Sequence, residues 1–428
     1  MTMQRRDFLR AAGAAAGAAV LPGCATMGGG SAGKVVVVGG GYAGATCAKY
    51  LRMWSNGAVD VTLIEPREAF VSCPISNLVI GGSKTIDYVT VPYDNLSRRW
   101  GVNVVRDTAT GIDVDKRVVT TAGGRNLPYD RLVLAPGIEF MWDAIASYKA
   151  DPARATGIVP HAWQAGEQTV LLRRQLESMP DGGVYALSIP VAPYRCPPGP
   201  YERACQVAWY FKRAKPKSKV LVLDGNPDVT SKAGLFKKAW NDLYKGIVEY
   251  RPNHVLADVD LATKTAKFET ADDVRASVLN VIPPHRAGGI ARTAGVITAN
   301  NRWCEVDFLS YESIRGKGVH VLGDSIQIAP GMPKSGHMAN NQAKVAAAAI
   351  LRQLGGQSPI ATPMLTNTCY SFITDKDVVH VASVHQYDVA KKTMLAVPGS
   401  GGLSPAMNEL EGRFALSWAQ NIWADTLG

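Results

Sequence analysis

Six cysteines are the side chains with the widest chemical range in this chain, once a seventh close to the N-terminus is set aside. Thiolates act as nucleophiles, form disulfides and bind metals. None of the cysteine spacings matches a Cys-x-x-Cys-His haem attachment site or a zinc-binding pair, and the 7 histidines are scattered, so we predict no metal site. The six residues are Cys47, Cys73, Cys196, Cys205, Cys304 and Cys369.

Cys196 differs from the others in its neighbours. It lies in the segment 190–203, PVAPYRCPPGPYER, in which the prolines fix φ and remove N–H donors. Such a loop holds a thiol in position, as a nucleophilic site requires. Glu202 of the same segment is either a proton relay or an ordinary surface glutamate, and the residues leave both open. Three thiols in predicted apolar elements are expected to be core residues: Cys47, Cys205 and Cys304.

The elements ahead of these cysteines predict a dinucleotide site. A β-branched run leads into GGGYAG and then into a predicted helix over 45–52. In this motif Gly39 allows the tight turn, Gly41 lets the backbone approach a pyrophosphate, and Gly44 lets the helix pack against the strand. A second β-branched run ends in Glu65, where an acidic residue bonds ribose hydroxyls.

Two later segments favour FAD as the dinucleotide. YDRLVLAPG at 129–137 is similar to the strand and turn that leave the first domain of flavoproteins with two dinucleotide-binding domains, and Gly137 lies at the turn. GVHVLGD at 318–324 is similar to the last strand of their flavin domain, whose terminal acid, here Asp324, binds the ribityl chain. A predicted helix over 336–354 would direct its N-terminus at the flavin ring.

A second glycine-rich phosphate loop is missing. The predicted strand 184–189 is followed by the proline-rich segment 190–203 instead of the Gly-x-Gly-x-x-Gly that receives NAD(P)H. That segment offers few amides to a pyrophosphate. We therefore expect that a nicotinamide nucleotide is not the electron donor.

The first 32 residues resemble a twin-arginine export signal. RRDFLR at 5–10 precedes an Ala/Gly-rich stretch that is too short and too weakly hydrophobic to span a bilayer. Such a signal predicts a folded, cofactor-loaded protein in the periplasm, where disulfides form. Cys24 follows Leu-Pro-Gly, a loose match to a lipoprotein box, but release near Ala32 is favoured over a lipid anchor.

Five short segments together resemble the flavoprotein subunit of flavocytochrome c sulfide dehydrogenase, which is related to the sulfide:quinone oxidoreductases. The similarity runs from Lys34 to Gly428. The segments are RCPPGPYER at 195–203, SCPISN at 72–77, IPP at 282–284, MPKSG at 332–336 and NTCYS at 367–371.

The resemblance implies roles for the remaining cysteines. Cys73 would hold FAD covalently through its 8α-methyl group, and Cys196 and Cys369 would form a redox-active disulfide. A tether suits a periplasmic protein, which cannot easily replace a lost cofactor. Pro74 departs from the family pattern and can tilt the linkage. Lys334 joins the expected flavin-binding residues. A plain staple between the same two cysteines would stabilise the fold by roughly 5 kcal/mol, so a structural role stays an alternative.

Length and composition set the fold class. With 428 residues, 46% hydrophobic and 19% charged, the chain is neither disordered nor a polytopic membrane protein. We predict an α/β fold that follows a signal peptide over 1–32. An FAD-binding Rossmann-like domain is split into 33–147 and 283–355, and a second Rossmann-like domain without the NAD motif is inserted at 148–282. A C-terminal domain covers 356–428. The net charge of +10 should attract acidic proteins, anionic lipid or small anions, and because no short stretch concentrates it, it does not indicate nucleic-acid binding.

The final predicted helix, 411–427, has an apolar stripe formed by Phe414, Trp418, Ile422 and Trp423. Core packing is its expected role. A docking face for a cytochrome and a membrane-surface anchor are the alternatives, and membrane association is not favoured.

These features predict a periplasmic subunit that oxidises hydrosulfide to sulfane sulfur or polysulfide and passes electrons from FAD to a c-type cytochrome partner in a heterodimer. A sulfide:quinone oxidoreductase and a non-catalytic, flavin-bearing sulfur carrier are the alternatives. A type II NADH dehydrogenase is disfavoured by the missing glycine motif.

Overall fold

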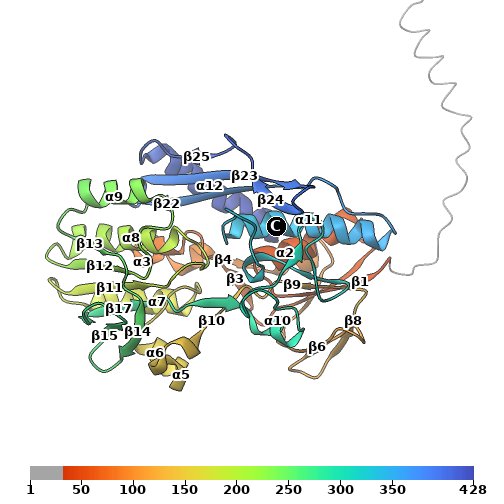
Figure 1. Cartoon of the computed structure of the whole chain (residues 1–428), viewed down its shortest axis with the longest axis horizontal. Coiled ribbons are helices and arrows are strands. Elements are labelled where there is room, and N and C mark those ends of the chain that lie inside the picture. The colour runs from red at the N-terminus through yellow and green to blue at the C-terminus, as the bar shows by residue number, and fades with distance from the viewer. Residues whose placement is uncertain (1–31) are drawn as a thin grey trace, which may run out of the picture.

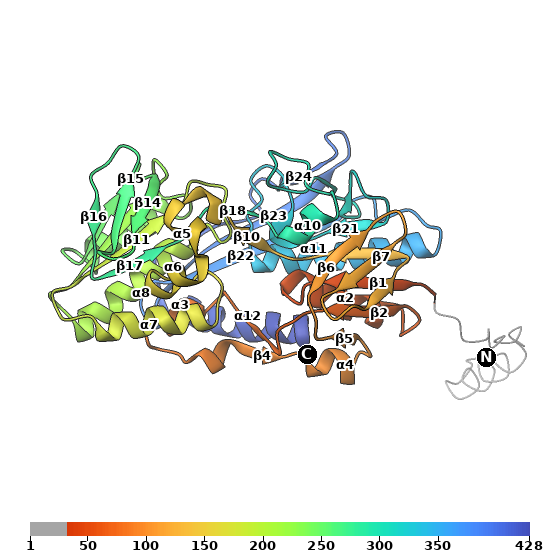
Figure 2. The same ribbon diagram turned by 90° about the horizontal axis from the view of Figure 1, so that it is seen from below.

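The computed structural model describes residues 32–428, so the export signal and Cys24 lie outside the described residues. Two α/β halves lie side by side, and the long strands β22 (Met364–Phe372) and β23 (Val378–Asp388) extend across both (Figures 1 and 2). The α/β class predicted from the sequence is confirmed.

The first half contains a seven-stranded sheet in the order β19-β20-β21-β9-β1-β2-β5. Its interior strand β1 (Lys34–Val38) pairs in parallel with its two neighbours, β9 and β2. Only Lys34 of this strand is exposed, as a continuous β-branched run predicts. The other strands are β2 (Asp60–Ile64), β5 (Asn103–Val105), β9 (Arg131–Leu134), β19 (Val306–Asp307), β20 (Glu312–Ser313) and β21 (Val319–Val321).

Two helices in contact, α2 (Tyr42–Trp54) and α11 (Gly336–Leu354), belong to this half (Figure 1). α2 begins three residues before the predicted start at 45, because Gly41 already serves as its N-cap. α11 has the predicted bounds, and the Ser335 side chain caps it by accepting a hydrogen bond from the Met338 N–H at 3.1 Å.

The second half is built on four parallel strands in the order β13-β12-β11-β17. Helix α8 (Gly199–Ala214) begins inside the segment expected to be a loop up to 203, because prolines suit the first turn of a helix. Glu202 therefore lies on the first turn of α8 and not on the loop. The strands are β11 (Val184–Ile189), β12 (Lys219–Asp224), β13 (Val248–Arg251) and β17 (Val278–Val281), and the other main helices are α7 (Glu167–Ser178) and α9 (Ala233–Asp242).

The C-terminal part is an antiparallel sheet backed by a long helix. β22 pairs with β23, which also pairs with β24 (Thr393–Ala396) and β25 (Gly402–Leu403). Helix α12 (Glu409–Leu427) starts two residues before the predicted helix, capped by the Asn408 side chain. Ala419 and Ile422 of α12 belong to the same buried cluster as β1, so this part shares the core of the first half. Within residues 32–428, no helix combines the length and apolar composition needed to cross a bilayer.

Shorter helices and strands connect these main elements. They are β3 (Ala69–Val71), α3 (Ser76–Ile80), β4 (Thr90–Pro92), α4 (Asp94–Arg98), β6 (Ala109–Asp113), β7 (Val118–Thr121), β8 (Asn126–Pro128), β10 (Ile138–Phe140), α5 (Ala146–Ala150), α6 (Pro152–Ile158), β14 (Leu256–Asp260), β15 (Thr265–Phe268), β16 (Val274–Arg275), β18 (His285–Ala287) and α10 (Gly289–Thr293).

Candidate active site

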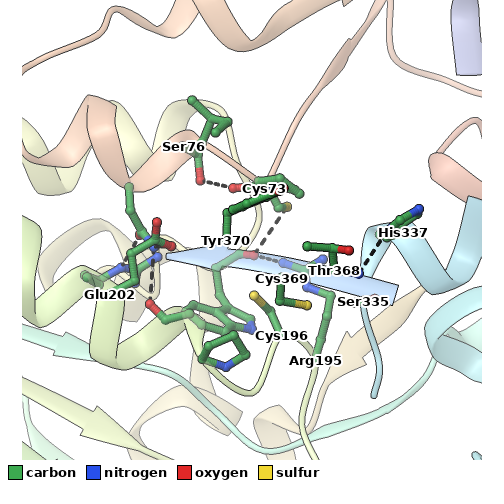
Figure 3. Close-up of a pocket in the computed structure, with 18 of the residues that line it drawn as sticks. Cys73, Ser76, Arg195, Cys196, Glu202, Ser335, His337, Thr368, Cys369 and Tyr370 are labelled. Atoms are coloured by element: carbon green, nitrogen blue, oxygen red, sulfur yellow. Dashed lines mark hydrogen bonds between the residues drawn. The ribbon is translucent and has the colours of Figure 1, made fainter. Parts of the chain in front are cut away.

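A pocket with an empty volume of about 750 Å³ is formed by both halves and the C-terminal sheet. Three of the six cysteines line it: Cys73 before α3, Cys196 before α8, and Cys369 on β22 (Figure 3). All six described cysteines are free thiols in this structure. The fold therefore gathers into one cavity the three thiols to which the resemblance assigned chemistry.

Backbone contacts hold Cys196 in an unusual conformation. Its φ is +58°, a left-handed value that is uncommon for a residue with a Cβ. The Cys196 N–H donates to the Lys334 carbonyl at 2.8 Å, and the Cys196 carbonyl accepts from the Gly199 N–H at 2.9 Å. Strained residues of this kind persist where the surroundings over-determine them, which is common at active sites. Burial, reinforced by Cys369 and Glu202, raises the pKa of the Cys196 thiol.

Cys369 lies in the middle of a regular strand. It pairs with Val381 of β23, and its Sγ is 3.5 Å from the Asn367 Nδ2 atom. Burial raises the pKa of this thiol, and the nearby Lys232 ammonium is the main effect that opposes the rise. Glu202 raises the pKa of both thiols, and the opposing cation is Lys232 for Cys369 and Arg195 for Cys196.

Cys73 lies in the turn that starts α3. Its carbonyl accepts from the Ser76 Oγ at 2.6 Å, and its Sγ is 3.9 Å from the Trp163 carbonyl oxygen. Ile75 in the same turn has a φ of +75°. Pro74, the departure from the family pattern, therefore belongs to a tight turn that keeps the Cys73 thiol on the pocket wall.

Glu202 connects the two cysteine-bearing elements. Its Oε1 accepts from the Phe372 N–H of β22 at 2.9 Å, and its Oε2 accepts from Asn77 Nδ2 at 2.8 Å. It is only 8% exposed, so it is not an ordinary surface glutamate. Burial raises the pKa of its carboxyl. A buried carboxyl on the wall of a thiol pocket has the properties of a proton-exchanging group.

The glycine loop has the geometry of a phosphate cradle. Gly39 has a φ of +99°, and a Cβ there would lie 2.4 Å from the Ala135 carbonyl oxygen. A Cβ at Gly44 would lie 1.8 Å from the Gly39 carbonyl oxygen, so only glycine fits. A Cβ at Gly41 would meet nothing within 4 Å, so this backbone faces open space, as pyrophosphate binding requires.

Glu65 is buried at the end of β2, but its oxygens already accept protein hydrogen bonds. Oε2 accepts from the Gly40 N–H at 2.7 Å, and Oε1 accepts from the Arg67 Nε at 2.8 Å. Arg67 lowers the pKa of this carboxyl against the opposing effect of burial. A ribose bound here would have to displace the Arg67 guanidinium.

Asp324 is the residue that best fits a missing polar ligand. It follows β21, and its Oδ1 is buried without a hydrogen-bond partner among the described residues. Such an atom is costly unless a hydroxyl or similar donor reaches it. Gly137, with a φ of +69°, accepts at its carbonyl from the Ser325 Oγ at 2.5 Å, so the two predicted flavin turns touch. The residues present therefore fit an FAD ribityl chain.

Lys334, predicted to bind flavin, is a buried cation held by two backbone carbonyls and an aromatic ring. Its Nζ donates to the Asp324 and Ile326 carbonyls at 2.8 and 2.6 Å, and lies 3.6 Å from the centre of the Trp303 ring. Burial lowers the pKa of this ammonium to about 7. Lys334 ties the Asp324 turn to the segment that holds Cys196.

In the second half, protein hydrogen bonds occupy the acid at the position typical of ribose recognition. Asp224 ends β12, where a dinucleotide-binding fold places the acid that bonds ribose. It is fully buried and accepts from the Tyr201 hydroxyl at 2.7 Å, the Tyr250 hydroxyl at 3.1 Å and the Asn226 Nδ2 at 2.7 Å. Protein donors thus saturate this carboxylate.

Several site residues had little or no signal in the sequence. Trp163 lines the pocket and belonged to no motif, whereas Arg195, which donates a guanidinium N–H to the Trp163 carbonyl, belonged to the 195–203 segment but had no assigned role. Lys232 lies just before α9 and had no recognisable motif. The C-terminal stripe divides: Ile422 and Trp423 are buried, Phe414 is 51% exposed, and Trp418 lines the pocket. The three cysteines expected to be core residues, Cys47, Cys205 and Cys304, are fully buried outside the pocket.

Comparison with known proteins agrees with these features. The central region of the sulfide dehydrogenase (flavocytochrome c) flavoprotein chain matches residues 169–283, and the flavin-binding region of flavocytochrome c sulfide dehydrogenase matches 361–427. The sulfide dehydrogenase flavoprotein chain of Chlorobaculum thiosulfatiphilum is 59% identical over 46 residues, which is 11% of this chain and 94% of that sequence. The chain belongs to this flavoprotein family. Residues 33–146 match the pyridine nucleotide-disulphide oxidoreductases.

Relatives that act on quinones are similar over more of the chain. Mitochondrial sulfide:quinone oxidoreductase of Dictyostelium discoideum is 25% identical over 302 residues, 68% of this chain and 65% of that protein. The alignment therefore spans just under two thirds of that relative. The X-ray structure of the Aquifex aeolicus sulfide:quinone oxidoreductase has the same fold, with a TM-score of 0.73, 19% identity and coverage of 92% of this chain and 91% of that one.

The export signal is also borne out. Residues 2–22 match the twin-arginine translocation signal, so the flavoprotein carries the signal for export to the periplasm. These residues lie outside the part of the chain that the structure describes.

Proposed function

We propose that this flavoprotein oxidises hydrosulfide at Cys196 and Cys369, holds FAD covalently at Cys73, and passes the electrons to a c-type cytochrome. The observation that carries the proposal is the convergence of these three thiols, from three separate segments, on one pocket. A structural staple would need only two of them and no cavity.

The proposed first step uses only groups of this chain and hydrosulfide. With Cys196 and Cys369 joined as a disulfide, hydrosulfide attacks one sulfur, a new S–S bond forms, and the old S–S bond breaks. The electron pair of the broken bond stays on the other cysteine as a thiolate, and the attacked cysteine carries a persulfide. Glu202, buried on the same wall, can accept or return the proton of the sulfur nucleophile.

The FAD would be held by the glycine loop at Gly39, Gly41 and Gly44, by Asp324, and by a thioether to Cys73. When bound, FAD supplies a two-electron acceptor for the cysteine pair and a one-electron donor for a haem protein. The Ser335 cap keeps the N-terminus of α11 on the pocket wall, where its dipole favours negative charge.

An apolar surface lies beside the pocket and is a candidate docking site for the electron acceptor. Leu410 and Phe414, one turn apart on α12, are 57% and 51% exposed, and Trp418 of the next turn lines the pocket. This surface suits either a cytochrome or a quinone. We favour the cytochrome because the family is the flavoprotein chain of a flavocytochrome c and because the protein is exported. A sulfide:quinone oxidoreductase is the second candidate.

Anaerobic stopped-flow mixing with sulfide tests the proposal. Cys196→Ser and Cys369→Ser should each abolish flavin reduction by sulfide while the flavin spectrum and fold persist. Cys205→Ala, at a buried thiol outside the pocket, should keep the rate and lower only the melting temperature. Near wild-type turnover in either serine variant would refute the catalytic pair. Sulfide turnover is then measured with a c-type cytochrome or with a soluble quinone, and the molecule that supports turnover is the acceptor. If neither supports turnover, the non-catalytic sulfur carrier becomes the favoured function.

A further inference from the structure

Lys232 is a buried cation with neutral hydrogen-bond partners. It is 5% exposed and lies at the N-cap of α9 with a φ of +57°. Its Nζ donates to the Cys369 carbonyl at 2.8 Å and to the Ser371 Oγ at 2.7 Å. Among residues 32–428, no ion pair within 4.0 Å involves this ammonium. An ammonium has three donors, and these two acceptors use two of them.

Burying a charge in this way is expensive without an anion nearby. The ionisable groups that act on Lys232 are Cys369 of β22, Glu202 of α8, Cys196 of the adjoining loop and Glu411 of α12. Both carboxylates already have protein donors: Phe372 and Asn77 for Glu202, and the Ser404 hydroxyl and the His380 ring for Glu411. Cys369 is the group whose own carbonyl holds the ammonium in place.

We infer that Lys232 is a positioning residue that places the negative charge on the sulfur of Cys369 when the cysteine pair is open. The inference rests on the proposed function, because it takes Cys196 and Cys369 as the pair that opens. Attack of hydrosulfide on Cys196 leaves the persulfide on Cys196 and the electron pair of the broken S–S bond as a thiolate on Cys369, where the ammonium stabilises it.

The electrostatic surroundings of the two thiols agree with this assignment. Lys232 is the main effect that lowers the pKa of the Cys369 thiol against burial. The pKa of Cys196 is raised by burial and again by Cys369 and Glu202, while Arg195 opposes the rise. Burial lowers the pKa of Lys232 itself to about 8, so its charge is present at neutral pH and fades above it.

Alkylation of the opened pair tests the inference without any turnover. The holoenzyme is reduced with a water-soluble phosphine, treated with iodoacetamide across a pH series, and digested, so that mass spectrometry reports Cys196 and Cys369 separately. In the wild type, the pH midpoint for Cys369 should lie below that for Cys196. In Lys232→Met, Cys369 alkylation at neutral pH should slow about tenfold or more, which corresponds to one pKa unit. Lys232→Arg should restore most of the rate.

Lys237→Met is the matched control, because Lys237 lies on the same helix but pairs with Asp228 at the surface. Its Cys369 midpoint should equal that of the wild type. An unchanged midpoint in Lys232→Met, or a Cys196 midpoint below that of Cys369 in the wild type, would overturn the inference. If Lys232→Met does not fold, the wild-type order of the two midpoints still can refute the inference, and the Cys369 rate in Lys232→Arg still tests the need for a cation at this position. Sulfide turnover in Cys369→Ser would instead refute the proposed function and leave the measured midpoints intact.

Discussion

Replacing Glu202 by glutamine separates a proton-relay role from a purely structural one. Glu202 accepts from the Phe372 N–H with one oxygen and from Asn77 Nδ2 with the other. The Asn77 amide cannot reverse, because its Oδ1 accepts from Arg203 and its Nδ2 also donates to the Gly199 carbonyl. Whichever way the new side-chain amide turns, its NH₂ group faces another donor.

The expected stability change follows from that mismatch. One buried donor loses its acceptor, which costs about 1–3 kcal/mol. A protonated carboxyl still offers two oxygens as acceptors, so the cost is present at low pH as well. Burial raises the pKa of Glu202 from 4.5, so the folded protein binds this proton more tightly than the unfolded chain. The stability from this group is complete below the unfolded pKa and is lost as the pH rises through the folded pKa. Glutamine does not titrate, so the free energy of unfolding of the variant does not fall in this way. The difference in the free energy of unfolding between wild type and Glu202→Gln should therefore become smaller as the pH rises.

The kinetic assay is anaerobic flavin reduction by sulfide across a pH series. Positioned acid–base groups contribute about 10²–10⁴-fold, so Glu202→Gln should slow the reaction by at least about 10²-fold and remove one limb of the pH profile. The control is Gln206→Met. Gln206 ties α8 to the same strand by donating to the Phe372 and Thr374 carbonyls at 2.9 and 2.7 Å, but it has no proton to exchange.

Gln206→Met should lower the denaturation midpoint and keep the pH profile. If Glu202→Gln behaves in the same way, with a wild-type rate and profile and only reduced stability, then Glu202 connects α8 to β22 and takes no part in proton transfer.

Two further predictions concern the cofactor and the electron donor. Acid precipitation of the wild type should carry its flavin into the pellet through the Cys73 thioether, whereas Cys73→Ala should release the flavin into the supernatant; flavin released from the wild type would contradict the tether. NADH mixed anaerobically with the protein should leave the flavin band unbleached, because protein donors saturate Asp224 and the loop after β11 is proline-rich; rapid bleaching would show that a nicotinamide site exists elsewhere.

Patterns that depend on local backbone geometry could be predicted from the sequence. The glycine loop, the β1 run and the bounds of α11 follow from glycine sterics, strand burial and a serine cap, all of which act within a few residues. The start of α8 was placed too late, because prolines that break a helix interior also suit its first turn.

Contacts between distant segments could not be predicted in this way. Lys232 and Cys369 are 137 positions apart, and nothing near Lys232 in the sequence indicates that its ammonium reaches β22. Likewise, periodicity placed Trp418 on an apolar stripe but could not distinguish a pocket wall from a core position, since both favour an aromatic ring.

In the second half, the loop that carries Cys196 and the acid at the position typical of ribose binding are linked by hydrogen bonds. In a dinucleotide-binding half, the turn after the first strand and the acid ending the second strand serve the nucleotide. Here that turn carries Cys196, and the acid, Asp224, accepts from the Tyr201 hydroxyl, which is 3.3 Å from the hydroxyl of Tyr194 in the cysteine loop. The carboxylate that would bind ribose therefore anchors the loop that presents the thiol. Binding of a ribose at Asp224 would require breaking this anchor, and the loop that positions Cys196 would lose that support.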